Sequence, residues 1–258
     1  MFGSFANVVI WRFPRGESLS HPGSHCPKCE TPIVWYDNIP VLSWILLRGR
    51  CRACGEPISF RYPAVEILSA ALWLLAGLLF GLSGQTVAAI CFFYLLMILA
   101  FIDTDTMRIP NPLVAALFGL GLVGAILGQV LRLPVVPLVP PGPGLLGMPV
   151  VQSLVGALVS AGVALAIAGA YALVRKTRGF GMGDVKLLGA IGVFLGLYGL
   201  LALFLGSVAG AIYGIAVGRG EEGAMRRRFP FGPFLAAAAV LVTAVGPALW
   251  GWYVGLFR

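Results

Sequence analysis

The chain has 258 residues, of which 59% are hydrophobic and only 11% are charged. In soluble globular domains, roughly a quarter of the residues are charged. This composition, with a mean hydropathy of +0.94, therefore excludes an ordinary soluble enzyme and predicts a polytopic membrane protein. No basic segment precedes the first apolar residues, so we expect no cleavable signal peptide.

The chain begins with a polar segment and continues as a helical membrane core. Residues 12–63 contain prolines, cysteines and charges, and we interpret them as a cytoplasmic insert. Residues 64–258 are interpreted as the membrane core. Within this core, residues 132–149 are rich in proline and glycine and predict an irregular external connection. No solenoid-like repeat is evident.

The insert holds two Cys-x-x-Cys pairs, Cys26 with Cys29 and Cys51 with Cys54. Each pair offers two thiolates from one tight turn, and together they supply the four ligands of a structural Zn²⁺. Two disulfides are the alternative, but a reducing cytoplasm disfavours them. Thioredoxin-type redox chemistry is a further alternative, although no βαβ pattern surrounds either pair. Cys91 lies in an apolar run and is expected to be a buried thiol.

Apolar runs in the core predict an all-α polytopic fold with about seven transmembrane helices, since a helix needs about 20 residues to cross a bilayer. The run at 185–199 is short by this measure. The seven runs are 64–82, 86–102, 113–131, 150–173, 185–199, 200–217 and 234–256.

The chain has a net charge of +8, and its basic residues are distributed unevenly among the segments outside the apolar runs. If successive connections lie on alternate sides of the membrane, then all 18 Lys and Arg residues except Arg132 and Arg258 fall on one side. The positive-inside rule identifies that side as the cytoplasm. The charge therefore indicates topology and attraction to anionic membrane lipid. Nucleic acid is not an expected partner, because no basic groove with interleaved aromatic residues is present.

Glu66 lies at the start of the first long run, three residues after Pro63. A carboxylate at a helix N-terminus is stabilised by the helix dipole. Because ionisable groups beside a membrane are costly and commonly functional, a binding role is the alternative.

Three of the four aspartates lie beside predicted spans: Asp103, Asp105 and Asp184. The predicted topology brings Asp103 and Asp184 to one face of the membrane at similar depth. Two neighbouring carboxyls cannot both ionise cheaply, so one keeps a proton. The ionised group can then activate a water while the protonated group donates to a substrate carbonyl. The pattern predicts an acid–base pair.

Each acidic residue also has a structural interpretation. Asp184 would lie at a helix N-terminus, where the dipole favours it without catalysis. That interpretation is weaker for Asp103, which follows a span and so lies at a helix C-terminus, where negative charge is disfavoured. Asp105 is expected to be solvated or to support the pair. Lys186 is expected to pair with Asp184 or to extend to the membrane interface.

The glycines on either side of Met182 suggest one more feature of this region. Gly181 and Gly183 lack side chains, so the backbone there can approach an extended peptide closely. We expect them to support the site.

Taken together, four stretches resemble the type IV prepilin peptidases, the leader peptidases and N-methyltransferases of type IV pilus and type II secretion systems. The stretches are 3–14; the two cysteine pairs with 38–44 between them and 61–66 after them; 102–111 together with the Gly-Met-Gly-Asp of 181–184 and its continuation to 186; and 230–234.

The resemblance implies a GxGD-type intramembrane aspartyl protease with Asp103 and Asp184 as its catalytic pair. Such enzymes cleave prepilin and pseudopilin leaders at the cytoplasmic face of the inner membrane, between a glycine and a hydrophobic residue. Bifunctional members then methylate the new N-terminus with S-adenosylmethionine. We hypothesise that Glu66 binds the substrate amine or the donor's sulfonium.

Family relatives carry a full hydrophobic segment that ends at the Gly-Ser-Phe of residues 3–5. Residues 1–11 are therefore interpreted as the remnant of a first membrane segment. Two other functions remain open: a peptidase without methyltransferase activity, and a transporter that uses Asp103 and Asp184 as a cation or proton relay. The sequence indicates no oligomeric state.

Overall fold

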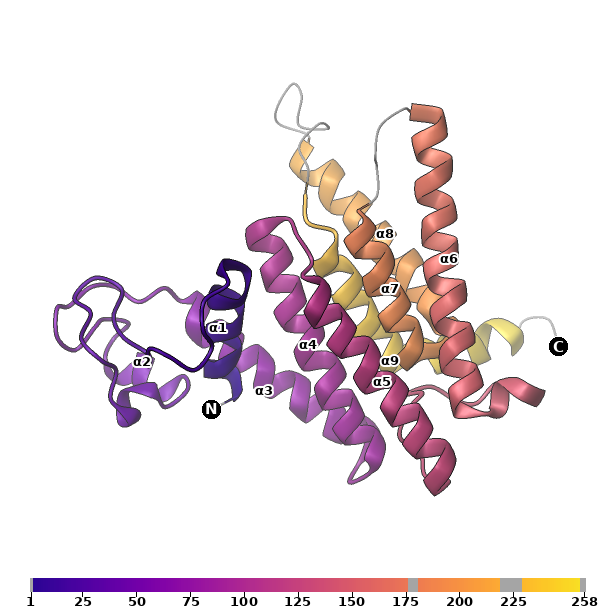
Figure 1. Ribbon diagram of the computed structural model, residues 1–258, viewed down its shortest axis with the longest axis horizontal. Coiled ribbons are helices and arrows are strands. Elements are labelled where there is room, and N and C mark those ends of the chain that lie inside the picture. Colours follow the sequence, from indigo (N-terminus) through magenta and orange to yellow (C-terminus); the bar gives the residue numbers. More distant parts are fainter. Residues whose placement is uncertain (1, 176–180, 219–228, 256–258) are drawn as a thin grey trace. The chain divides into compact units, whose positions relative to one another are not determined.

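The computed structural model describes residues 2–175, 181–218 and 229–255 (Figure 1). These residues are largely helical, and within them no strand forms beyond two isolated β-bridges in the cysteine segment. The chain divides into two compact units, Met1–Leu75 and Ala76–Arg258. Part of the predicted basic charge, at 176–178, 219 and 226–228, lies outside the described residues.

The first unit contains a helix pair and the cysteine segment. Helices α1 and α3 run antiparallel, because the Phe2 ring lies 4.8 Å from that of Trp73 while Asn7, further along α1, donates to the Tyr62 carbonyl at 3.1 Å. The elements are α1 (Phe2–Arg12), η1 (Phe13–Arg15), η2 (Trp35–Asn38), α2 (Leu42–Leu46) and the first part of α3 (Arg61–Phe80).

The second unit is a helix bundle. Its elements are α4 (Gly84–Thr106), α5 (Asn111–Leu131), η3 (Gly144–Gly147), α6 (Pro149–Arg175), α7 (Met182–Leu195), η4 (Gly196–Tyr198), α8 (Gly199–Gly218) and α9 (Gly232–Gly255). Figure 1 shows the end of α4 and the starts of α7 and α9 toward the same end of this bundle.

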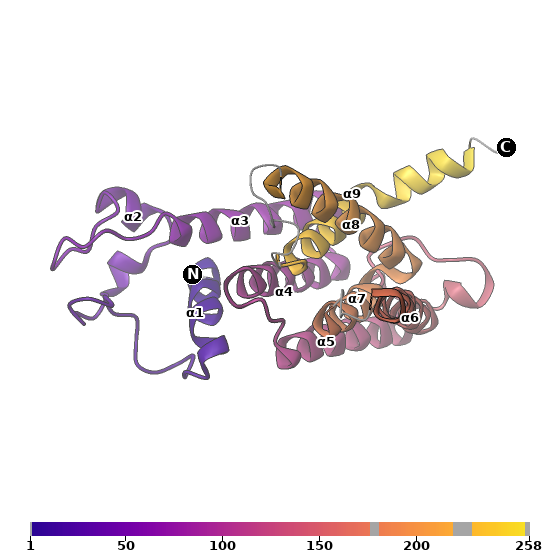
Figure 2. The ribbon, with the colours of Figure 1, turned by 90° about the horizontal axis from the view of Figure 1, so that it is seen from above.

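Helix α7 is the innermost helix of the bundle, in contact with α5, α6, α8 and α9 (Figure 2). It is apolar on all sides from Leu187 to Leu195, and these residues are buried, as expected for such a helix. Phe194 stacks on Phe92 of α4 at 4.4 Å. A Cβ on Gly156 or on Gly192 would lie 2.4 Å from the other's carbonyl oxygen. The small residues thus let α6 and α7 pack backbone to backbone.

Six segments of the described chain are long and apolar enough to cross a membrane. The seven predicted runs correspond to α3 through α9. However, α7 and α8 are separated only by η4 and count as one segment, Met182–Ala216. Alone, the 14 residues of α7 extend about 21 Å, which is short of the roughly 30 Å hydrocarbon core.

The connection between α5 and α6 is irregular, as predicted, but it is not peripheral. Val136 and Leu138 are buried. The Leu138 N–H donates to the carbonyl of Phe194 at 2.8 Å, so this loop satisfies an orphan carbonyl at the C-terminal end of α7. It closes the end of α7 opposite Asp184.

Candidate active site and cysteine cluster

Asp103 lies in the last turn of α4 and is only 5% exposed. Its Oδ2 accepts the backbone N–H of Gly232, the first residue of α9, at 2.9 Å. A Cβ at position 232 would lie 2.8 Å from the same oxygen, so only glycine lets α9 begin here undisturbed. The unsatisfied N–H groups of a helix start are ready partners for a carboxylate.

Asp184 lies in the first turn of α7, after the N-cap residue Gly181. A Cβ on Gly181 would lie 2.8 Å from Oδ2 of Asp184, and one on Gly183 would lie 3.1 Å from Cβ of Ile109. Close packing within the chain therefore explains why both positions are occupied by glycine. Their predicted role in approaching a peptide stays a prediction.

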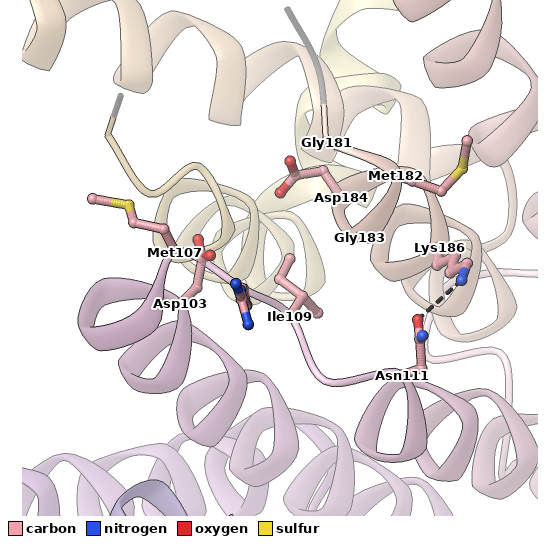
Figure 3. Close-up of a pocket in the computed structure, with 10 residues that line it drawn as sticks. Asp103, Met107, Ile109, Asn111, Gly181, Met182, Gly183, Asp184 and Lys186 are labelled. Carbon is pink, nitrogen blue, oxygen red and sulfur yellow. Dashed lines mark hydrogen bonds between the residues drawn. The ribbon is translucent and has the colours of Figure 1, made fainter. Parts of the chain in front are cut away.

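The two carboxylates reach one cavity of about 370 Å³ from different helices. Figure 3 shows both side chains extending toward the same space. The other residues that line it are Met107, Arg108, Ile109, Asn111, Gly181, Met182, Gly183 and Lys186. The cavity can hold water and a segment of peptide between two carboxyl groups, which is the arrangement needed for general acid–base hydrolysis.

The structure places Lys186 and Asp105 differently from the two cavity carboxyls of Asp103 and Asp184. Lys186 donates to Oδ1 of Asn111 at 2.9 Å rather than to Asp184 (Figure 3). This bond joins the start of α7 to the start of α5. Asp105 is exposed, and it is not among the residues that line the cavity.

Gly232 is the contact that sequence reasoning missed. In the sequence, the stretch 230–234 contributes to the family resemblance but indicates no role for Gly232. Glycine between two prolines and before a long apolar run was the available signal, because it indicates a backbone position in close approach to another group.

Glu66, in the second turn of α3, joins three segments of the first unit. Its Oε1 accepts the hydroxyl of Ser4 in α1, and its Oε2 accepts the N–H of Val41 at 2.7 Å. A Cβ on Gly3 would lie 2.8 Å from Cα of Glu66. The carboxylate thus holds α1, α3 and the start of α2 together.

The four cysteines form one cluster, with their Sγ atoms all within 4.8 Å of one another. Cys26 and Cys54 are 3.8 Å apart at sulfur, and Cys29 and Cys51 are 4.0 Å apart. Tetrahedral zinc with Zn–S bonds of about 2.3 Å places its sulfurs about 3.8 Å from one another. The cluster therefore fits such an ion. The fifth cysteine, Cys91, is free and half-buried.

Each cysteine pair lies in a turn, and the two turns repeat with an offset of 25 residues. The stretches 24–33 and 49–58 read SHCPKCETPI and GRCRACGEPI. In both, the N–H of the first cysteine donates to the carbonyl of the residue five positions later, Thr31 or Glu56. The N–H of the final isoleucine donates to the carbonyl of the first residue of the stretch. The residue after the second cysteine has positive φ in both, at Glu30 and Gly55. The matching Cys-x-x-Cys, proline and isoleucine positions of the two stretches are the sequence signal of this short repeat.

Contacts across and beside the cluster support it. The Thr31 hydroxyl lies 3.3 Å from the Cys29 sulfur, and hydrogen bonding to Thr31 lowers the pKa of Cys29 to about 6. This favours the thiolate that a metal binds. An ion pair between Lys28 and Glu56 joins the two turns.

Two family models match the chain. The bacterial peptidase A24 N-terminal domain matches residues 1–80, and the type IV leader peptidase family matches residues 90–215. The first match includes all four cysteines, and the second includes Asp103 and Asp184. No solved structure gives a significant match.

Curated relatives match along nearly the full length. A prepilin leader peptidase/N-methyltransferase of Aeromonas salmonicida is 34% identical over 98% of this chain and 90% of its own length. Proteins of the same name from Bacillus subtilis and Neisseria gonorrhoeae are 35% and 30% identical. They cover 98% and 97% of this chain, and 94% and 89% of the relatives' own lengths.

Proposed function

The chain belongs to the type IV leader peptidase family, and we therefore propose that it cleaves the leaders of type IV prepilins and pseudopilins and methylates the new N-terminus. The observation that carries the catalytic assignment is the shared cavity of Asp103 and Asp184.

In the proposed reaction, one carboxylate takes a proton from water as the water oxygen bonds to the scissile carbonyl carbon. The other, protonated, carboxyl donates to the carbonyl oxygen. As the peptide C–N bond breaks, the carboxyl that took the proton from water donates it to the leaving nitrogen, and the other carboxyl recovers its proton from the carbon-bound hydroxyl. We assign the base role to Asp103, because the N–H of Gly232 is a charge-assisted partner for an ionised oxygen. Asp184 then acts as the acid.

The chemistry is proposed to occur at the cytoplasmic face of the inner membrane. Arg108, in the connection between α4 and α5, lines the cavity. The connections predicted to lie on the same side of the membrane hold most of the basic residues. Positive loops remain in the cytoplasm during insertion. Prepilin leaders would enter the cavity from that side.

The cysteine cluster is proposed to bind a structural Zn²⁺. Four thiolates leave no open coordination position, so the ion would stabilise the fold of the segment rather than act on substrate. Cys26, Cys29, Cys51 and Cys54 are its ligands in this proposal.

Methyl transfer requires S-adenosylmethionine as a second substrate and a deprotonated substrate amine. We propose that Glu66 supports this step through its negative charge. Each of its oxygens already accepts a hydrogen bond from the chain but retains capacity for another. Its role in joining α1, α3 and α2 is the competing explanation, and a comparison of Glu66→Gln with Ser4→Ala separates the two.

The decisive assay uses a synthetic prepilin incubated with the purified full chain, with and without S-adenosylmethionine, followed by mass spectrometry. We expect cleavage in both samples and a mass increase of one methyl group only with the donor. Cleavage without methylation would indicate a peptidase that lacks methyltransferase activity. Absence of both reactions would reject the proposal and favour a transporter.

A further inference from the structure

The first unit carries an exposed apolar surface that neither proposed reaction uses. It is formed by Trp35 and Tyr36 of η2 and by Leu42, Ile45 and Leu46 of α2, and the two elements contact each other. Trp35 is 80% exposed, Leu46 72% and Ile45 58%. Exposed apolar groups gathered in this way mark a contact surface. We call these five residues the η2–α2 surface.

A hydrogen bond from the residue before α2 fixes the position of this surface along α3. The N–H of Val41, just before α2, donates to Glu66 at 2.7 Å. Glu66 lies five residues beyond the start of α3 at Arg61, or about 7.5 Å along the helix. Because Arg61–Phe80 is a candidate span, α2 begins beside the first turns of a membrane helix.

An aromatic contact gives the same placement independently. The ring of Trp44 in α2 lies 5.7 Å from that of Phe60, the residue before α3. Phe60 is itself largely exposed. The η2–α2 surface is thus continuous with the part of α3 at which the chain enters the bilayer.

Basic residues follow α2 directly. Arg48 and Arg50 are exposed and form no ion pair among the described residues. The neighbouring Arg52, in contrast, is held by Asp37 at 2.6 Å. Tryptophan and leucine side chains beside uncompensated arginines are typical of segments that lie in a membrane interface rather than across it.

We propose that the η2–α2 surface lies in the bilayer interface, with Trp35, Ile45 and Leu46 at the boundary between headgroups and acyl chains. Arg48 and Arg50 then contact anionic headgroups. This contact would hold the cysteine segment against the membrane at a fixed level relative to α3. The proposal does not depend on the catalytic or zinc assignments.

The test places an environment-sensitive fluorescent amino acid at Leu46 of the full chain in lipid nanodiscs. Two quenchers are compared: a nitroxide on the upper acyl chain of the lipid, and iodide in the water. The matched control carries the same label at Ser20, an exposed polar position of the same unit. Unchanged circular dichroism and size-exclusion profiles confirm that both labelled proteins are folded.

We expect lipid quenching at position 46 to exceed that at position 20 by about threefold or more, and iodide quenching to be correspondingly weaker. Equal quenching by iodide at both positions would overturn the proposal. Protection of position 46 from both quenchers would also overturn it, because a protein partner would then cover the surface.

A second comparison tests the charged part of the proposal. Lipid quenching at position 46 should rise by about twofold when anionic lipid is added to neutral nanodiscs. The double substitution Arg48→Gln with Arg50→Gln should remove this increase. A rise that persists in the double variant would contradict the assignment of these two arginines.

Discussion

The cysteine cluster and the aspartate cavity are two sites built in opposite ways. In the cluster, each pair of ligands comes from one short turn whose hydrogen bonds close within ten residues. In the cavity, Asp103 comes from the end of α4, Asp184 from the start of α7, and the Gly232 contact from the start of α9, 129 residues beyond Asp103.

This difference determines what each site depends on. Few apolar residues are buried around the site made from local turns, so an ion bound between its halves would contribute much of its stability. A site made from helix ends needs the whole bundle, and is kept in place by the buried contacts of α7. We therefore expect damage to the first site to be relieved by metal, and damage to the second to be insensitive to metal.

The largest effect is expected from the aspartates. Asp103→Asn and Asp184→Asn should each reduce leader cleavage by roughly 10²–10⁴-fold, because each removes one half of a general acid–base pair. Asp105→Asn is the matched control and should be much milder, since Asp105 does not line the cavity. Cleavage of a synthetic prepilin by each purified variant provides the measurement. A dead Asp105→Asn beside an active Asp103→Asn would refute the assignment.

Loss of the metal site should disrupt the other region while leaving the bundle folded. The purified protein should hold about one Zn²⁺ per chain, and Cys26→Ser should release it and loosen residues 12–63. Elemental analysis and hydrogen exchange of that segment measure the two effects. Cys91→Ser is the control, because Cys91 lies outside the cluster. Freshly purified, active protein without zinc would contradict the site.

Gly232→Ala tests the contact between distant helices. The added Cβ would lie 2.8 Å from Oδ2 of Asp103, so the carboxylate or the start of α9 must move. A displacement of this kind commonly costs on the order of 10²-fold in rate, and we expect the loss in kcat rather than in KM. Gly251→Ala, near the other end of α9 with open space around its Cβ, should leave cleavage unchanged. Equal activity of both variants would remove Gly232 from the site.

A smaller and more selective effect is expected at Glu66. Glu66→Gln should impair methylation more than cleavage, because it removes a negative charge while keeping a side chain of similar shape. Ser4→Ala is the matched control, since it removes the contact to Oε1 but keeps the charge. Mass spectrometry of the processed prepilin distinguishes the products. Parallel behaviour of the two variants in both reactions would make Glu66 a purely structural joint.

The sequence predicted what depends on local pattern. Apolar runs located the helices, and cysteine spacing indicated four ligands that the structure brings together. Asp103 and Asp184 were placed on one face by counting spans, and they line one cavity. Their catalytic roles and the division into residues 1–11, 12–63 and 64–258 stay predictions.

The remaining features depend on which helices become neighbours, which no periodicity specifies. The apolar run of α7 does not reveal that it is central and too short to cross alone. The proline-rich loop gave no sign that Leu138 would bond to Phe194. For the same reason Gly232 could not be assigned to Asp103 before the fold was known.

The central claim is that Asp103 and Asp184 act as one unit, and a double-mutant cycle tests it most directly. Cleavage rates are measured for Asp103→Asn, Asp184→Asn and the double variant, with folding of the bundle checked by circular dichroism and thermal unfolding. When two residues act as a unit, substituting either one removes nearly all of the catalytic activity, and the second substitution has little further effect. We expect the double variant to be no slower than either single variant. Losses that multiply in the double variant would show independent roles and contradict the pair.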